Sequence, residues 1–269
     1  MKFDVVTVEL SKQVKLQYVE QGNPLGLPLI LLHGYADSWH SFKRVLPYLP
    51  KSIRAFALTQ RGHGNASRPV TGYHSRDFSM DLAAFMDTLE LETAVVAGGS
   101  SGGIIARRFA IEHPNRTLGL ILVGSPLALK DKPGVLALWD STISKLKDPI
   151  DPSFVREFVK SQLAQQVPQA FLRTVIKENL KVPARVWRAT LKGLLEDDSS
   201  DKLKNIKAPT LIVWGNKDGI IPRSDEETLQ KRIAGSQLVV YPSAGHALYW
   251  EEPARFASDI VAFVEHLDR

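Results

Sequence analysis

The sequence predicts an α/β protein built on a mostly parallel, eight-stranded sheet flanked by helices, with an all-helical segment inserted before the last two strands. Strand-like apolar runs alternate with helical runs, which is typical of parallel strands joined by helical crossovers. Between residues 126 and 205 this alternation stops and only helical runs occur. We therefore predict a core made of residues 1–125 and 206–269, and a helical cap, or lid, made of residues 126–205.

The composition restricts the classes of function. The 269 residues are 44% hydrophobic and 23% charged, as in an ordinary globular protein, and the chain contains no cysteine. Disulfides, thiolate metal sites and a cysteine nucleophile are therefore excluded. The formal net charge is +5, but the basic residues are scattered rather than clustered, so we expect no nucleic-acid partner. No apolar run is long enough for a signal segment or a membrane span, and we expect a soluble, cytoplasmic protein.

The core elements follow one another in a regular order. Two runs with alternating polarity at the N-terminus predict an antiparallel hairpin, and the later apolar runs predict strands covered on both faces. The expected strands are residues 3–10, 14–22, 28–34, 53–59, 92–99, 117–125, 209–215 and 237–242. The expected core helices are residues 38–49, 75–91 with Ser75 as the N-cap, 104–113, 224–233 and 253–267.

The inserted segment is expected to contain four helices, near residues 133–147, 152–166, 168–181 and 183–196. Pro152, Pro168 and Pro183 each stand where a first helical turn tolerates proline. The apolar faces of these four helices either pack on the core or cover a substrate pocket. We expect some of their apolar residues to do the first and others the second.

Residues 94–106, AVVAGGSSGGIIA, contain two overlapping Gly-x-Ser-x-Gly patterns. A strand that enters this pattern and continues as a helix is the context of a nucleophile elbow, in which small residues two before and two after the serine permit a sharp turn. Ser100 is the favoured nucleophile, because it also leaves glycine at position 103, where helix and strand pack closely. Ser101 and a purely structural glycine-serine turn are the alternatives.

A nucleophilic serine needs a base and an orienting acid. Asp218 and His246 follow the last two predicted strands, which gives the chain order Ser, Asp, His expected of this architecture. Asp218 in NKDG is alternatively a simple turn residue, and His246 a loop histidine without a role. The backbone N–H groups of Tyr35 and Ser101 are the expected donors to an oxyanion.

Five motifs in order resemble the α/β-hydrolase superfamily over nearly the whole chain: LLHGYADSWHSF, QRGHGNAS, AGGSSGGIIA, GNKDGIIP and AGHALYWEEP. The resemblance implies a serine hydrolase under a helical lid, without a metal or cofactor. Three departures stand out. Thr59 replaces the usual aspartate before the arginine turn. Gly99 and Ser101 replace the usual bulky residues before and after the nucleophile, so we expect a roomier and more polar elbow.

The expected reaction is hydrolysis of a carboxylic ester or lactone with a small apolar acyl group, and acyl-homoserine lactones fit that description. The aromatic and imidazole side chains expected to contact the substrate are Trp39, His40, Trp139, Phe154, Phe158, Trp187 and Tyr249, although core packing explains most of them equally well. A C–C bond hydrolase or perhydrolase with the same triad, and a small-molecule receptor with residual hydrolysis, are the alternatives. The sequence indicates no oligomeric state.

Overall fold

The computed structural model describes residues 3–11 and 14–267, and it confirms the predicted sheet. Eight strands lie in the order β1-β2-β4-β3-β5-β6-β7-β8. β1 pairs with β2 and β2 with β4 in antiparallel fashion, and all the other neighbours are parallel. The strands are β1 (Val5–Ser11), β2 (Val14–Gln21), β3 (Leu27–Leu32), β4 (Ile53–Thr59), β5 (Ala94–Gly99), β6 (Thr117–Val123), β7 (Thr210–Gly215) and β8 (Gln237–Tyr241).

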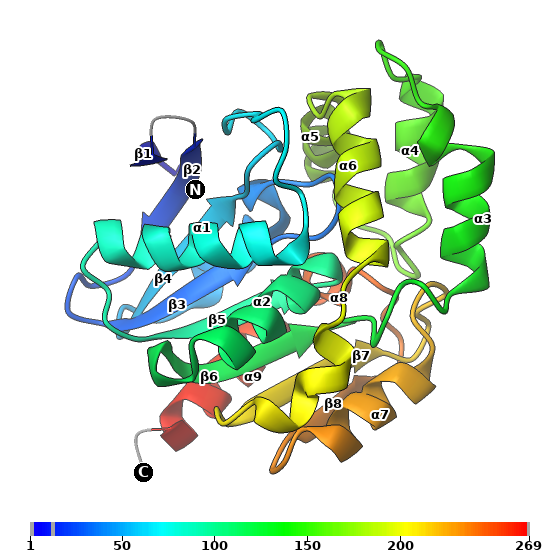
Figure 1. Ribbon diagram of the computed structural model, residues 1–269. Coiled ribbons are helices and arrows are strands. Elements are labelled where there is room, and N and C mark those ends of the chain that lie inside the picture. Colours follow the sequence, from blue (N-terminus) through cyan, green and yellow to red (C-terminus); the bar gives the residue numbers. More distant parts are fainter. Residues whose placement is uncertain (1–2, 12–13, 268–269) are drawn as a thin grey trace.

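Helices cover both faces of this sheet, as the continuous apolar strands require. All residues of β5 and β7 are buried. α1 and α2 lie in front of the sheet in Figure 1 and α9 lies behind it. The core helices are α1 (Ser75–Thr88), α2 (Ser101–Glu112), α7 (Arg223–Arg232), α8 (Leu248–Glu251) and α9 (Pro253–Leu267).

The predicted helical segment between β6 and β7 is also confirmed. It forms α3 (Pro133–Ser141), α4 (Pro152–Lys160), α5 (Gln169–Leu180) and α6 (Ala184–Leu195). These helices gather at one end of the sheet, beyond the end where β6 finishes (Figure 1). Ligands bind at the carboxyl ends of the strands in open α/β sheets, so the segment lies where it could cover a site.

Two local predictions are wrong. Residues 38–49 form two short 3₁₀-helices (Trp39–Phe42 and Leu46–Tyr48) instead of one helix. Pro47 has no N–H to donate to a preceding carbonyl, so a regular α-helix cannot continue through it. Ser75 is the first residue of α1 and not its N-cap, because its hydroxyl donates to Asp197, at 2.5 Å.

Asp197 belongs to a buried network that fastens the end of the helical segment to α2. Its carboxylate accepts hydrogen bonds from Arg107 at 3.3 Å and from Arg108 at 2.8 Å. The Arg107 side chain is fully buried and also donates to the carbonyls of Pro126 and Leu127, where the segment begins. One arginine of α2 therefore holds both ends of the inserted segment.

Candidate active site

The elbow is centred on Ser100, which lies between β5 and α2. Its backbone has φ 52° and ψ −121°, a left-handed conformation that L-residues other than glycine rarely adopt. The Ser100 N–H donates to the carbonyl of Val123 at 2.8 Å, which ties the strained turn to β6. Such strain persists only where its surroundings impose it, and it is concentrated at functional sites. Ser101 is instead the first residue of α2 and is buried.

The neighbouring glycines show why the turn requires this register. A Cβ on Gly98 would lie 2.2 Å from the carbonyl oxygen of Gly102, and one on Gly102 would lie 2.4 Å from that of Leu32. Both contacts are with backbone and leave no room for a side chain. The two glycines that flank Ser100 at two residues' distance are therefore needed for strand and helix to approach each other.

Gly99 does not make the elbow roomier, contrary to the sequence-based expectation. A Cβ at Gly99 would lie 2.7 Å from the hydroxyl oxygen of Tyr249. Tyr249 is buried and stacks on Phe42, with ring centroids 5.1 Å apart. The Tyr249 ring occupies the space that a bulky residue at position 99 would take. A side chain from α8 therefore fills the space left by Gly99.

His246 and Asp218 form a hydrogen-bonded pair in the loops after β8 and β7. His246 Nδ1 lies 2.8 Å from Asp218 Oδ2, and the two side chains are 4% and 0% exposed. The other carboxylate oxygen, Oδ1, accepts from the N–H groups of Ile220 and Ile221 at 2.8 and 2.9 Å. These two donors fix the carboxylate as the acceptor for Nδ1–H. His246 Nε2 is then left as the nitrogen that can take up a proton.

The loop after β3 brings Tyr35 next to the elbow. A Cβ on Gly34 would lie 3.4 Å from the Ser100 Cβ, so the backbone of this loop passes directly beside the serine. Among the described residues, no partner takes up the N–H of Tyr35 or that of Ser101. Both are therefore available to a ligand atom at Ser100.

His33 holds that loop in place. Its Nε2 accepts the N–H of Gln60 at 3.0 Å, so Nδ1 carries the proton and donates to the Gly34 carbonyl at 2.8 Å. Full burial, with a smaller effect of nearby His63, keeps the pKa of His33 well below its ordinary value, and the ring is neutral. Because the Gly34 carbonyl and the Tyr35 N–H share one peptide plane, His33 fixes the direction of the Tyr35 N–H.

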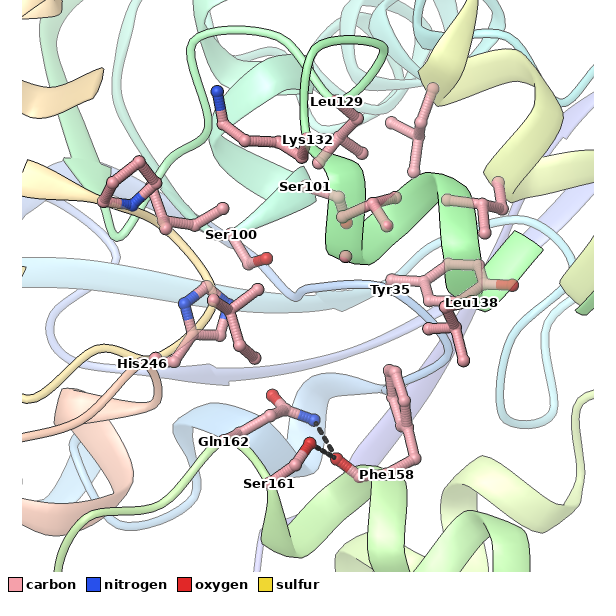
Figure 2. Close-up of a pocket in the computed structure, with 18 of the residues that line it drawn as sticks. Tyr35, Ser100, Ser101, Leu129, Lys132, Leu138, Phe158, Ser161, Gln162 and His246 are labelled. Carbon is pink, nitrogen blue, oxygen red and sulfur yellow. Dashed lines mark hydrogen bonds between the residues drawn. The ribbon is translucent and has the colours of Figure 1, made fainter. Parts of the chain in front are cut away.

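One cavity of about 470 Å³ brings these groups together (Figure 2). Ser100, Ser101, Tyr35 and His246 lie in its wall, and most of the remaining wall is apolar. The other lining residues are Leu129, Lys132, Pro133, Gly134, Val135, Leu138, Phe158, Ser161, Gln162, Leu191, Leu194, Gly219, Ile220, Ile221 and Pro222. This volume suits a small ligand, and an apolar wall with few polar groups is typical of ligand sites.

Lys132 is the one lysine or arginine that lines the cavity in the described part of the chain. Its Nζ lies 2.9 Å from Asp225 Oδ1, and the two side chains are only 15% and 6% exposed. In Figure 2 the amino group points away from Ser100. The charge is neutralised by Asp225, so it is the aliphatic stem of Lys132 that contributes to the wall.

Of the seven side chains expected to contact the substrate, Phe158 lines this cavity and the other six do not. Trp187 is fully buried and packs edge-on against Tyr35, Phe154 and Phe158. The other five are also used in packing: Trp39 and His40 stack on each other, Tyr249 lies beneath the elbow, and Trp139 and Phe154 pack on the core. Aromatic rings bury more apolar area than any other side chain, and here that area stabilises the fold.

The sequence-based reasoning missed the aliphatic lining of α3 and α6, together with Ser161 and Gln162 after α4. Ile220 and Ile221 could have been identified, because they directly follow Asp218 in the GNKDGIIP motif. The α3 and α6 residues carry no such signal, since an apolar helix face reads the same whether it covers a core or a cavity.

Within residues 3–11 and 14–267, no group of three or more His, Cys, Asp or Glu side chains could hold a metal ion. Over the same residues, no helix is long and apolar enough to cross a bilayer. The expected cytoplasmic location stays a prediction.

Comparisons with known proteins agree with this fold. The family model described as alpha/beta hydrolase fold matches residues 28–253. A 2-hydroxymuconate semialdehyde hydrolase from Pseudomonas sp. (strain CF600) is 32% identical over 255 residues, covering 90% of this chain and 88% of the relative. An esterase from Exiguobacterium antarcticum superposes with a TM-score of 0.84 at 25% identity, covering 94% and 96% of the two chains.

An enol-lactonase from Burkholderia xenovorans LB400 has the same fold, with a TM-score of 0.80 at 18% identity over 94% of this chain and 98% of the other. The resemblance suggested by the five sequence motifs is thereby confirmed. The chain belongs to the alpha/beta hydrolase fold family.

Proposed function

We propose that this protein is a serine hydrolase that cleaves carboxylic esters or lactones with a small, neutral, apolar acyl group. The observation that carries the proposal is that His246, which is hydrogen-bonded to the buried Asp218 at 2.8 Å, lines the same cavity as the strained Ser100. A perturbed backbone at a serine, together with a base oriented by a buried acid, is the arrangement that nucleophilic catalysis needs. The assignment of the helical segment 126–205 as a lid is part of this proposal.

In the proposed reaction, His246 Nε2 takes the proton from Ser100 Oγ as that oxygen attacks the acyl carbonyl. Asp218 holds the imidazole in the required tautomer and stabilises the imidazolium that forms. The free N–H groups of Tyr35 and Ser101 stabilise the negative charge on the carbonyl oxygen. His246 then gives its proton to the leaving alcohol, and water activated by the same nitrogen releases the acid from Ser100.

The character of the wall supports a neutral, apolar acyl group. Leu129, Val135, Leu138, Leu191 and Leu194 surround the cavity on the side of the lid. A carboxylate placed there would have no unpaired cation to meet among the described residues, because Lys132 is occupied by Asp225. Burying an unpaired charge is costly, so the wall favours acyl groups without one.

A C–C bond hydrolase is the second candidate, and the 32% identity to the 2-hydroxymuconate semialdehyde hydrolase favours it. The compound in that relative's name carries a carboxylate. The neutralised Lys132 argues against a substrate of that charge here, which is why the ester or lactone reaction is placed first.

The test is proton release at neutral pH with short and medium aliphatic esters, simple lactones, N-acylated lactones and a ring-cleavage dienoate. Ser100→Ala is the control for every substrate. We expect many turnovers on an ester or lactone and none in the variant. Turnover of the dienoate alone would replace the proposal by the second candidate, and turnover that persists in Ser100→Ala would refute the role of the serine.

A further inference from the structure

We propose that Gln162 forms a subsite for the leaving alcohol, and that the preferred substrates are esters whose alcohol carries a second hydroxyl group close to the ester oxygen. This inference rests on the proposed hydrolase function, in which His246 protonates the alcohol as it leaves. The leaving group must therefore lie on the side of the cavity where His246 stands, with the acyl chain on the side of the apolar lid residues.

Gln162 lies on the same side as His246, because the two backbones are bonded directly. The carbonyl of Gln162 accepts the N–H of Ala247, the residue after His246, at 3.0 Å. On the other side of His246, a Cβ on Gly245 would lie 3.1 Å from that same carbonyl oxygen. The turn after α4 thus rests on the catalytic histidine loop without an intervening side chain.

A carboxylate from α8 fixes this arrangement. Glu251 Oε1 accepts the N–H groups of Ala164 and Gln165 at 2.5 and 2.8 Å, and Oε2 accepts that of Gly245 at 2.6 Å. One side chain therefore bonds the turn that follows Gln162 and the residue that precedes His246. Fixed in this way, Gln162 is a preorganised partner for a ligand and does not have to be ordered on binding.

The side-chain amide of Gln162 is oriented so that it presents an acceptor. Its Nε2 is directed at the carbonyl of Phe158, 3.4 Å away, and the Ser161 hydroxyl donates to the same carbonyl at 2.9 Å. In Figure 2 the amide nitrogen points toward Phe158, which leaves the amide oxygen turned into the cavity. No hydrogen bond to this Oε1 occurs within the described residues. A carbonyl-type oxygen in such a place calls for a hydrogen-bond donor on the ligand, and a hydroxyl is the simplest.

The test compares three hexanoate esters of similar size: propyl, 2-hydroxyethyl and 2-methoxyethyl. The kcat/KM of each is measured for the wild type, for Gln162→Met, which keeps the side-chain length, and for Gln166→Met. Gln166 is exposed and does not line the cavity, so it is the matched control. The ratio of kcat/KM between two esters in one variant does not depend on the fraction of that variant that is folded. Comparison of this ratio between variants removes the effect of the intrinsic reactivity of the esters. Gln162→Ala repeats the measurement if the methionine variant does not fold.

We expect the ratio of 2-hydroxyethyl to propyl ester to fall about threefold to tenfold in Gln162→Met, the range of one neutral hydrogen bond. The ratio of 2-methoxyethyl to propyl ester should not change, because an ether has no proton to donate. Equal ratios in wild type and Gln162→Met, or the same fall in Gln166→Met, would overturn the subsite while leaving the hydrolase intact. Absence of turnover on all three esters in the wild type would overturn this inference, and absence of turnover on the other esters and the lactones of the earlier panel as well would overturn the proposed function.

Discussion

The substitution Glu251→Gln gives the sharpest test of how the inserted helical segment and the His246 loop are joined. The carboxylate accepts three backbone N–H groups, two from the turn 164–165 and one from Gly245. A glutamine has one acceptor oxygen. If that oxygen takes the place of Oε1, the amide nitrogen faces the Gly245 N–H, and one buried donor is left without a partner.

The expected cost follows from these contacts. Loss of a hydrogen bond to a charged acceptor costs about 1.5–3 kcal/mol, and the two remaining bonds weaken because the acceptor is no longer ionised. We expect a loss of about 3 kcal/mol in the free energy of unfolding. For a chain of this size that lowers the Tm by roughly 6–12 °C. Because the His246 loop is freed on one side, kcat should also fall, by about tenfold to a hundredfold.

Glu252→Gln is the matched control, since Glu252 is the next residue but accepts, within residues 3–11 and 14–267, only from the side chains of Gln165 and Arg255. Thermal unfolding and steady-state kinetics on one ester are measured for both variants. We expect Glu252→Gln to stay close to the wild type in Tm and kcat. Equal behaviour of the two variants would refute the reasoning, because it would mean that the three backbone bonds to Glu251 contribute nothing beyond a surface carboxylate.

Three further predictions concern the elbow and the loop after β3. Turnover should fall by about a thousandfold or more in Ser100→Ala but stay within about tenfold of the wild type in Ser101→Ala, because only the backbone N–H of Ser101 is used. Steady-state kinetics on one ester test this prediction. Equal losses in the two variants would contradict the assignment of Ser100 as the nucleophile. Gly102→Ala should prevent folding, since its Cβ would lie 2.4 Å from a carbonyl oxygen, whereas a Cβ at Gly134 would meet no atom within 4 Å and Gly134→Ala should fold. Circular dichroism and the yield of soluble protein test this prediction. A well-folded Gly102→Ala would refute the packing argument. Burial raises the pKa of Asp37 to about 7 from an unfolded value near 3.8. Between these two pH values the native state binds more protons than the unfolded state, so the stability falls as the pH rises through that window. Asp37→Asn should remove this fall, and parallel curves of Tm against pH for the two proteins would contradict the prediction.

The order of elements and the identity of the triad candidates could be predicted from the sequence, because both depend on local patterns. Strands with continuous apolar runs must be covered on both faces, so the alternation of strands and helices is enough to predict a parallel sheet. The elbow could be predicted for a similar reason, since a sharp turn around Ser100 leaves only glycine at positions 98 and 102. Asp218 and His246 followed from their places after the last two strands.

The composition of the cavity wall could not be predicted, and the physical reason is that packing and binding use the same residue types. Trp187 and Tyr249 were expected at the substrate, but each is more stabilising when its ring is fully surrounded, as it is here. Gln162 carried no signal, because its place beside His246 depends on backbone bonds between segments more than eighty residues apart. The sequence by itself therefore determined the sheet, the elbow and the order of the triad candidates, all of which depend on local spacing. Only the tertiary structure decided which residues of the inserted segment line the cavity at Ser100, because that depends on how the helices of residues 126–205 are fastened to the core.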